Sequence, residues 1–133
     1  MTFFDTGILV GAVLERHPEH DACRAALENE AAALTNAHAL AETFATLTGF
    51  YKVPVAAATE LVLGLKKRLR VESLTLGDYE TAIREAHKRG VMGGGIYDAL
   101  HATFARRRGA KRILTRNPAH FRHAAPDLEI ISP

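Results

Sequence analysis

Cysteine is almost absent from this 133-residue sequence, in which Cys23 is the only one. A single thiol excludes an internal disulfide and a cysteine-based metal site, and it fits a reducing compartment. No apolar run approaches the roughly eighteen residues of a membrane span, and Asp5 interrupts the apolar N-terminus, which has no basic residue before it. We therefore expect a cytoplasmic protein without a signal peptide or membrane contact.

Several common catalytic motifs are also missing. The sequence has no GxSxG elbow, no GxGxxG fingerprint and no P-loop, since Gly93–Gly95 is not followed by Lys and Ser or Thr. These absences speak against a serine hydrolase of the elbow type, a dinucleotide-binding enzyme and a P-loop nucleotide hydrolase.

Short apolar runs alternate with longer helical patterns along the whole chain, which we interpret as one domain over residues 1–133. The predicted strands are Thr2–Asp5, Ala31–Thr35, Arg70–Leu74, Arg112–Thr115 and Leu128–Ile131. The predicted helices follow Asp5, begin at Pro18, and cover 37–50, 54–68, 75–90 and 96–108, with one helical turn at Asn117-Pro118. This alternation predicts a three-layer α/β sandwich with parallel strands.

Charge is divided unevenly between the two halves of the chain. Residues 1–65 carry three basic and eight acidic side chains, whereas residues 66–133 carry fourteen basic and seven acidic ones. The basic side chains cluster at Lys66–Arg68, Lys88–Arg89 and Arg106–Arg108. Such clusters attract a polyanion. Alternatively, they occupy helix C-termini, where the helix dipole favours cations.

Glu42 is the only charged residue between Ala31 and Tyr51. Its predicted helix places Leu40, Phe44 and Leu47 on an apolar stripe, and Glu42 points away from it with alanines nearby. A partly buried carboxylate is costly unless it is paired or binds a cation. The alternative is a surface Glu favoured by the dipole early in the helix.

Asp98 repeats this pattern in the helix that follows Gly93–Gly95. It lies opposite the apolar stripe of that helix, and the glycines allow a close backbone approach to a ligand. Here too a first-turn acid favoured by the dipole, after a flexible turn, is the alternative.

Asp5 and Asn117 each follow a predicted strand and precede a helix. Both residue types are preferred helix N-caps, and Pro118 strengthens that interpretation for Asn117. The functional interpretation rests on their place, because ligands of parallel α/β sheets bind at the carboxyl ends of the strands.

Together, these four residues predict an oxygen-rich cation site that suits Mg²⁺ or Mn²⁺ better than zinc. Such a site favours phosphodiester hydrolysis, with the basic half of the chain holding a nucleic-acid backbone. A His–carboxylate metal site built from Asp98 and His101 is conceivable, but we interpret His101 as a core or hydrogen-bonded histidine.

Four segments resemble one family in order and spacing: FFDTGILV, NAHALAETFATLTG, GGGIYDALHATFARRRGAKRILTRNPAHF and LEII. They are similar to the PIN-domain toxins of bacterial type II toxin–antitoxin systems, the VapC-like ribonucleases. The resemblance covers nearly the whole chain. It implies a single PIN-like domain, with a central, mostly parallel sheet of about five strands between helices, that hydrolyses RNA with Mg²⁺ or Mn²⁺.

The resemblance also implies roles for the site residues. Asp5 and Asp98 correspond to metal ligands, Glu42 to the group that orients or deprotonates the attacking water, and Asn117 to a contact with substrate or nearby water. Thr6 and Thr115 match hydroxyl positions that line the pocket. They are the predicted substrate contacts, together with Arg116 of the basic half.

The sequence departs from the family pattern at two positions. Gly7 stands where the family commonly has Asn or Ser, and Asn117 stands where it often has Asp. Both departures support an alternative, a catalytically inactive PIN-like module that binds RNA or a partner protein. A purely helical nucleic-acid-binding domain would leave Glu42 and Asp98 unexplained, because lone acids repel phosphate.

Partners are implied by the same resemblance. Such toxins pair with a small antitoxin protein and tend to form homodimers. The apolar stretch Val53–Leu65 offers a groove or a dimer face, or is simply a core helix.

Overall fold

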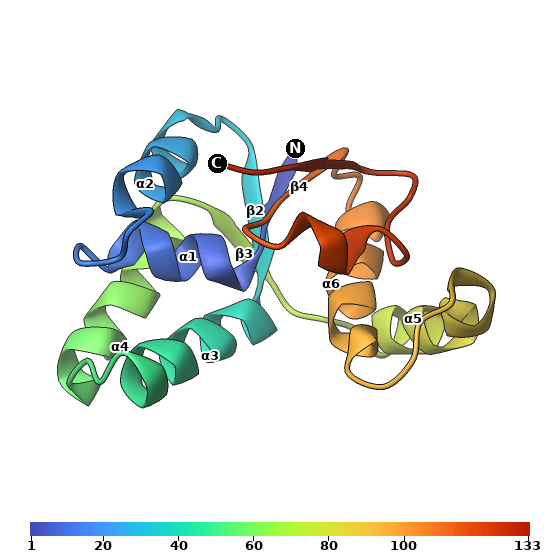
Figure 1. The fold of residues 1–133 in the computed structure, drawn as a ribbon, viewed down its shortest axis with the longest axis horizontal. Helices are drawn as coiled ribbons and strands as arrows, with labels where there is room; N and C mark the ends of the chain where they lie inside the picture. The colour runs from blue at the N-terminus through green and yellow to red at the C-terminus, as the bar shows by residue number, and fades with distance from the viewer.

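The computed structural model describes residues 1–133 and contains a five-stranded sheet between two layers of helices (Figure 1). The strands are β1 (Thr2–Phe4), β2 (Ala33–Asn36), β3 (Arg70–Glu72), β4 (Arg112–Leu114) and β5 (Glu129–Ile131). Their order in the sheet is β3-β2-β1-β4-β5, and every neighbouring pair is parallel. The predicted three-layer α/β/α fold is confirmed.

Six α-helices connect and cover the strands. They are α1 (Thr6–Val13), α2 (His20–Asn29), α3 (Ala37–Ala45), α4 (Val55–Gly64), α5 (Leu76–Arg89) and α6 (Gly95–Arg107). Three short helical turns extend them: a π-helical turn at Thr46–Phe50 and 3₁₀ turns at Leu65–Lys67 and Pro118–Phe121. None of these helices is long and apolar enough to cross a membrane.

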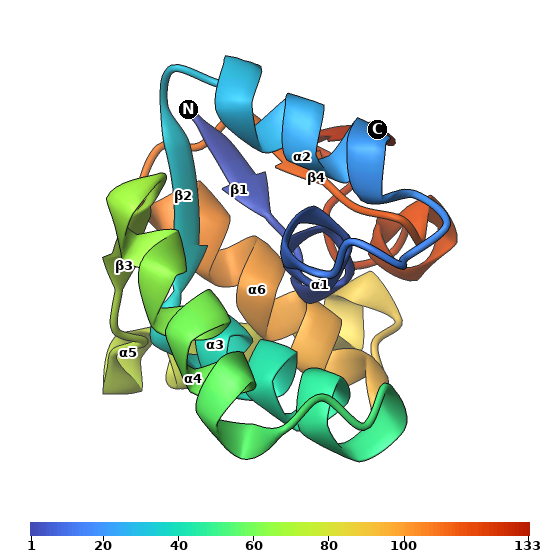
Figure 2. The ribbon, with the colours of Figure 1, turned by 90° about the vertical axis from the view of Figure 1, so that its left-hand side faces the viewer.

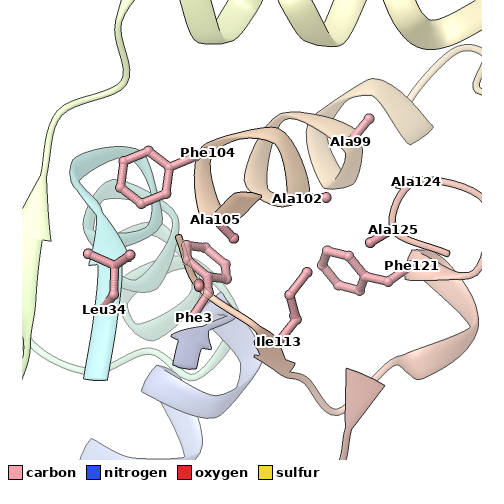
Figure 3. Packing of buried hydrophobic residues seen from close by; sticks show 11 residues of the cluster. Phe3, Leu34, Ala99, Ala102, Phe104, Ala105, Ile113, Phe121, Ala124 and Ala125 are labelled. Carbon is pink, nitrogen blue, oxygen red and sulfur yellow. The ribbon is translucent and has the colours of Figure 1, made fainter. Parts of the chain in front are cut away.

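Successive side chains of a strand point to opposite faces of the sheet, and this divides the core in two. Phe3, Leu34 and Ile113 pack against α6 and the segment around Phe121 (Figure 3). Phe4, in contrast, packs on the face covered by α1 and α2, which lie in front of the sheet in Figure 2. The layers therefore follow from the alternation within each strand.

The fifth helix has the ends that its sequence predicts. Thr75 and Asp78 form a reciprocal capping box at its start, and Gly90 ends it with a φ of 67°. Thr75 accepts a hydrogen bond from the Asp78 backbone, and the Asp78 carboxylate accepts one from the Thr75 backbone.

Several element boundaries differ from the prediction; β3, for example, ends at Glu72 rather than Leu74. β2 begins two residues later than expected and includes Asn36. The helix predicted over 37–50 is α-helical only to Ala45 and continues as the π-helical turn, after which Lys52 has a φ of 57° as the chain reverses toward α4. Pro18 lies in a turn ahead of α2, which begins at His20.

The basic clusters lie at helix ends, as the alternative interpretation of the sequence predicted. Lys88 and Arg89 are in the last turn of α5, and Arg106 and Arg107 are in the last turn of α6. Arg106 forms a salt bridge with Asp127. Part of the positive charge of the second half is therefore neutralised within the fold.

Candidate acidic site

Asp5 lies at the carboxyl end of β1, where it is the N-cap of α1 and only 8% exposed. Its Oδ1 accepts a hydrogen bond from the Thr6 backbone N–H at 2.9 Å. Its Oδ2 accepts one from the Thr115 hydroxyl, which follows β4, at 2.7 Å. The ends of two adjacent strands are thereby joined through this carboxylate.

Glu42 reaches the same edge of the sheet from α3, with 35% of its side chain exposed. Its Oε1 lies 2.9 Å from Nε2 of His101 and accepts a hydrogen bond from the Thr6 hydroxyl at 3.0 Å. Burial alone would raise the pKa of Glu42, but the contacts with His101 and Thr6 hold the pKa below its usual value. Glu42 is therefore ionised at neutral pH.

Asp98 lies in the first turn of α6, with 29% of its side chain exposed. Burial raises its pKa, and the negative charges of Asp5 and Glu42 raise it further, against the opposing effect of His120 and His101. The nearest basic atom, Nδ1 of His120, is 3.6 Å away, which is too far for a hydrogen bond. Asp98 is therefore a half-buried acid without a hydrogen-bond donor, and its ion-pair partner is only the exposed His120 ring.

Asn117 lies near these acids but does not bond to them. Its backbone N–H donates to the Thr115 hydroxyl at 3.0 Å, while its side chain is exposed and forms no cap for the following 3₁₀ turn. The expected side-chain cap is thus absent. The same turn carries His120, which faces Asp98.

Arg116 covers the position of the first departure from the family pattern. Its side chain lies over Gly7, where an added Cβ would meet the arginine Cδ at 3.6 Å, and its guanidinium pairs with Glu19. The space beside Gly7 is therefore partly filled by an arginine from the end of β4.

Sequence reasoning missed one residue of this edge and recognised another. His101 is buried and hydrogen-bonded, as predicted, with its ring between Glu42 and Asn36. Asn36 was not singled out, although an asparagine between a strand and a helix is itself a capping signal. It caps α3 by accepting a hydrogen bond from the Ala39 N–H.

The donor set of this edge suits a hard cation. Asp98 accepts no hydrogen bond from the protein, and both donors to Glu42 contact Oε1 rather than Oε2. No group of three or more His, Cys, Asp or Glu side chains is close enough to hold a metal ion, so the His–carboxylate metal site is not formed. A cation held by one or two carboxylates and a substrate phosphate needs no such cage.

The comparisons with known proteins agree with this arrangement of strands and helices. The PIN domain family matches residues 2–126. The chain belongs to the PIN-domain family. No curated protein matches its sequence.

Solved structures with the same fold include components of toxin–antitoxin systems. The Mycobacterium tuberculosis toxin VapC20, described as cleaving the sarcin–ricin loop, has a TM-score of 0.70 and 20% identity over 85% of this chain and 87% of its own. A chain of VapBC2 from Rickettsia felis, solved with a promoter DNA fragment, has a TM-score of 0.71 and 19% identity over 99% and 98%. A chain of FitAB, also solved with DNA, has a TM-score of 0.71 and 17% identity over 100% and 95%. At these identities the likeness establishes the PIN fold.

Proposed function

We propose that this PIN domain is a Mg²⁺- or Mn²⁺-dependent endoribonuclease and the toxin of a type II toxin–antitoxin pair in the cytoplasm. One observation carries the proposal: Asp98 is partly buried beside Asp5 and Glu42, accepts no hydrogen bond from the protein, and has as its ion-pair partner only the exposed His120 ring, at 3.6 Å. Such a concentration of negative charge is stable when a divalent cation binds it.

Each residue of the site has a separate role in this proposal. Asp5 and Asp98 hold the cation, which supplies a Lewis acid for the phosphodiester when bound. Glu42 orients the attacking water and accepts its proton. Thr6 and Thr115 position the acids, because their hydroxyl groups donate to Glu42 and Asp5.

The exposed side chains of Asn117 and Arg116, together with the partly buried Thr6, border the substrate. Thr115, which the sequence also predicted as a substrate contact, is fully buried and acts only through Asp5. A separate basic pocket lies where the end of α5 meets the segment after the last 3₁₀ turn. It is lined by Lys88, Arg89, Arg122, His123 and Pro126. Its positive charge suits the phosphates of an RNA strand that leaves the acidic edge past His120.

An antitoxin has a fitting surface on the other helical layer. A groove between α1, α2 and α4 is lined by both apolar and charged side chains. Leu61 and Leu65 from the apolar stretch Val53–Leu65 contribute to it, next to Val13 and Leu27. An amphipathic helix of a small partner protein suits such a groove. The homodimer stays a prediction from the resemblance.

A non-catalytic module is the second candidate. The exposed Asn117 side chain, which bonds to none of the acids, favours it, because the fourth corner of the site then adds no charge. This candidate retains the basic pocket and the groove as binding surfaces.

The test is cleavage of a structured RNA by the purified protein in Mg²⁺ or Mn²⁺. We expect cleavage in either metal, none in EDTA, and none by the Asp98→Ala variant. Asp21→Asn is the matched control, since Asp21 is also a first-turn acid but lies exposed on α2. Cleavage in EDTA or by Asp98→Ala would overturn the mechanism, and RNA binding without cleavage in both metals would establish the non-catalytic module.

A further inference from the structure

Asn36, His101 and Glu42 form an unbroken chain of hydrogen bonds at the acidic edge. Asn36 Nδ2 lies 2.9 Å from His101 Nδ1, and His101 Nε2 lies 2.9 Å from Glu42 Oε1. At the start of the chain, Asn36 Oδ1 accepts the Ala39 backbone N–H at 2.9 Å. The chain therefore runs from the backbone of α3 to the carboxylate carried by the same helix, by way of α6.

The direction of every hydrogen bond in this chain is fixed by its first member. Because Oδ1 of Asn36 faces the Ala39 N–H, the amide nitrogen must face His101. An amide nitrogen only donates, so His101 Nδ1 accepts and carries no proton. The proton of the neutral ring is then on Nε2, which donates to Glu42. The tautomer follows from these partners.

Burial makes this arrangement rigid. Asn36 is 0% exposed and His101 is 2% exposed. The ring of Phe3 packs on the imidazole with a centroid distance of 5.4 Å. Water has little access to replace a broken hydrogen bond, and a buried polar group without a partner is costly. The chain is thus held by β2, by α6 and by the core between them.

The effect at Glu42 is selective for one oxygen. His101 and Thr6 both contact Oε1, which leaves Oε2 without a donor from the protein. Two donors, one from α1 and one from α6, fix the rotamer of Glu42 and the orientation of its carboxylate. A glutamate without them would sample several rotamers, because its side chain is otherwise unbranched and partly exposed.

We propose that Asn36 and His101 are positioning residues that hold Glu42 in the orientation required for its role at the scissile phosphodiester. The proposal rests on the proposed nuclease function, but its structural part does not depend on that function. Neither residue touches the substrate. Both act through Glu42.

The tautomer can be measured without any activity. Nitrogen-15 NMR of the histidine rings is expected to show His101 with an unprotonated Nδ1 and a protonated Nε2, assigned by loss of the signals in His101→Gln. In Asn36→Asp, the carboxylate retains the cap of α3 but can only accept from the ring, so Nδ1 becomes protonated. An Nδ1 protonated in the wild type, or unprotonated in Asn36→Asp, would overturn the hydrogen-bond chain.

Kinetics test the positioning role. We expect Asn36→Asp and His101→Leu to lower kcat by about 10- to 100-fold with little change in KM, the usual effect of removing a residue that orients another. His101→Gln restores part of the loss, because its amide can still donate to Glu42. The matched controls are Asn29→Asp and His87→Gln, which change exposed residues of the same types.

Thermal denaturation shows whether each variant is folded. If His101→Leu does not fold, the kinetics of Asn36→Asp decide the positioning role. Wild-type rates in a folded Asn36→Asp protein whose His101 Nε2 no longer carries a proton would overturn the positioning role, provided that Glu42→Gln is inactive. Absence of cleavage by the wild type would instead overturn the nuclease proposal, and the NMR result would still decide the hydrogen-bond chain.

Discussion

Asp78 and Asp98 both lie in the first turn of a helix, and their helices α5 and α6 pack against each other. Their surroundings are opposite. The fully buried Asp78 carboxylate accepts hydrogen bonds at 2.7 Å from both Arg107 and Arg108, and one at 2.8 Å from the Thr75 backbone. Asp98 accepts none, and its neighbours Asp5 and Glu42 are themselves acids.

The pKa values of the two carboxyl groups move in opposite directions as a result. Burial acts to raise both. At Asp78 the hydrogen bonds from Arg108 and from the Thr75 backbone outweigh burial and hold the pKa below its usual value. At Asp98 burial and the charge of Asp5 act together, and the pKa is raised. The protein neutralises the first acid with two arginines and gives the second only a histidine at 3.6 Å, and this contrast supports the functional role that we propose for Asp98.

The largest expected effect comes from neutralising the unpaired acid. Asp98→Asn is expected to lower kcat for RNA cleavage by at least about 100-fold, because a carboxylate ligand of the proposed cation is lost. The same change removes repulsion among the acids, so the midpoint of thermal unfolding without metal stays the same or rises. An RNA-cleavage assay and a thermal denaturation curve, recorded on the same protein preparation, measure kcat and the unfolding midpoint. A clear loss of stability would contradict the contrast with Asp78.

Much of this contrast was visible in the sequence. Thr75 followed by Asp78 three residues later is a capping-box pattern, and Asp98 opposite an apolar stripe predicted a buried acid; both patterns are local. The fold class followed from the alternation of strands and helices for the same reason. These predictions needed only neighbouring residues.

What the sequence did not predict depends on contacts between distant residues. The arginines that neutralise Asp78 come from the far end of α6, and Asn36 meets His101 across 65 positions of the chain. The missing side-chain cap of Asn117 has a different, local cause, since the hydroxyl of Thr115, two residues away, bonds to its backbone while the side chain is exposed. Periodicity and residue preference carry no information on such pairings.

The next largest effect is expected for the neutralised acid. Asp78→Asn leaves two guanidinium groups beside an amide, and breaking a buried ion pair by removing one partner costs about 3–5 kcal/mol. The Arg107 side chain is 43% exposed, and water screens part of this ion pair. We therefore expect the free energy of unfolding to fall by about 3 kcal/mol, the lower end of this range. Urea denaturation measures it. The folded fraction should cleave RNA with the kcat of the wild type.

The pH dependence of this loss is its control. Since the folded protein lowers the pKa of Asp78 from its usual 3.8, the stabilisation is present above that pH and is lost as the pH falls through the lower, folded value. The difference in unfolding free energy between the wild type and Asp78→Asn should therefore be constant near neutral pH and shrink below pH 3.8. A difference that persists in acid would point to packing rather than charge.

The smallest effect is expected when Arg107 is replaced. This change tests whether Arg108 alone is enough to neutralise Asp78. Arg107 and Arg108 donate to the same oxygen, so Arg107→Ala leaves the carboxylate paired and should cost less than about 1 kcal/mol, as for an exposed ion pair. Arg108→Ala is the matched comparison and should cost more. Its side chain is only 15% exposed, it also donates to the Ser73 carbonyl, and its guanidinium lies 4.2 Å from the centre of the Phe104 ring. Equal losses in urea denaturation would mean that the exposed arginine carries half of the neutralisation, and the surplus of cations at Asp78 would be smaller than the geometry indicates.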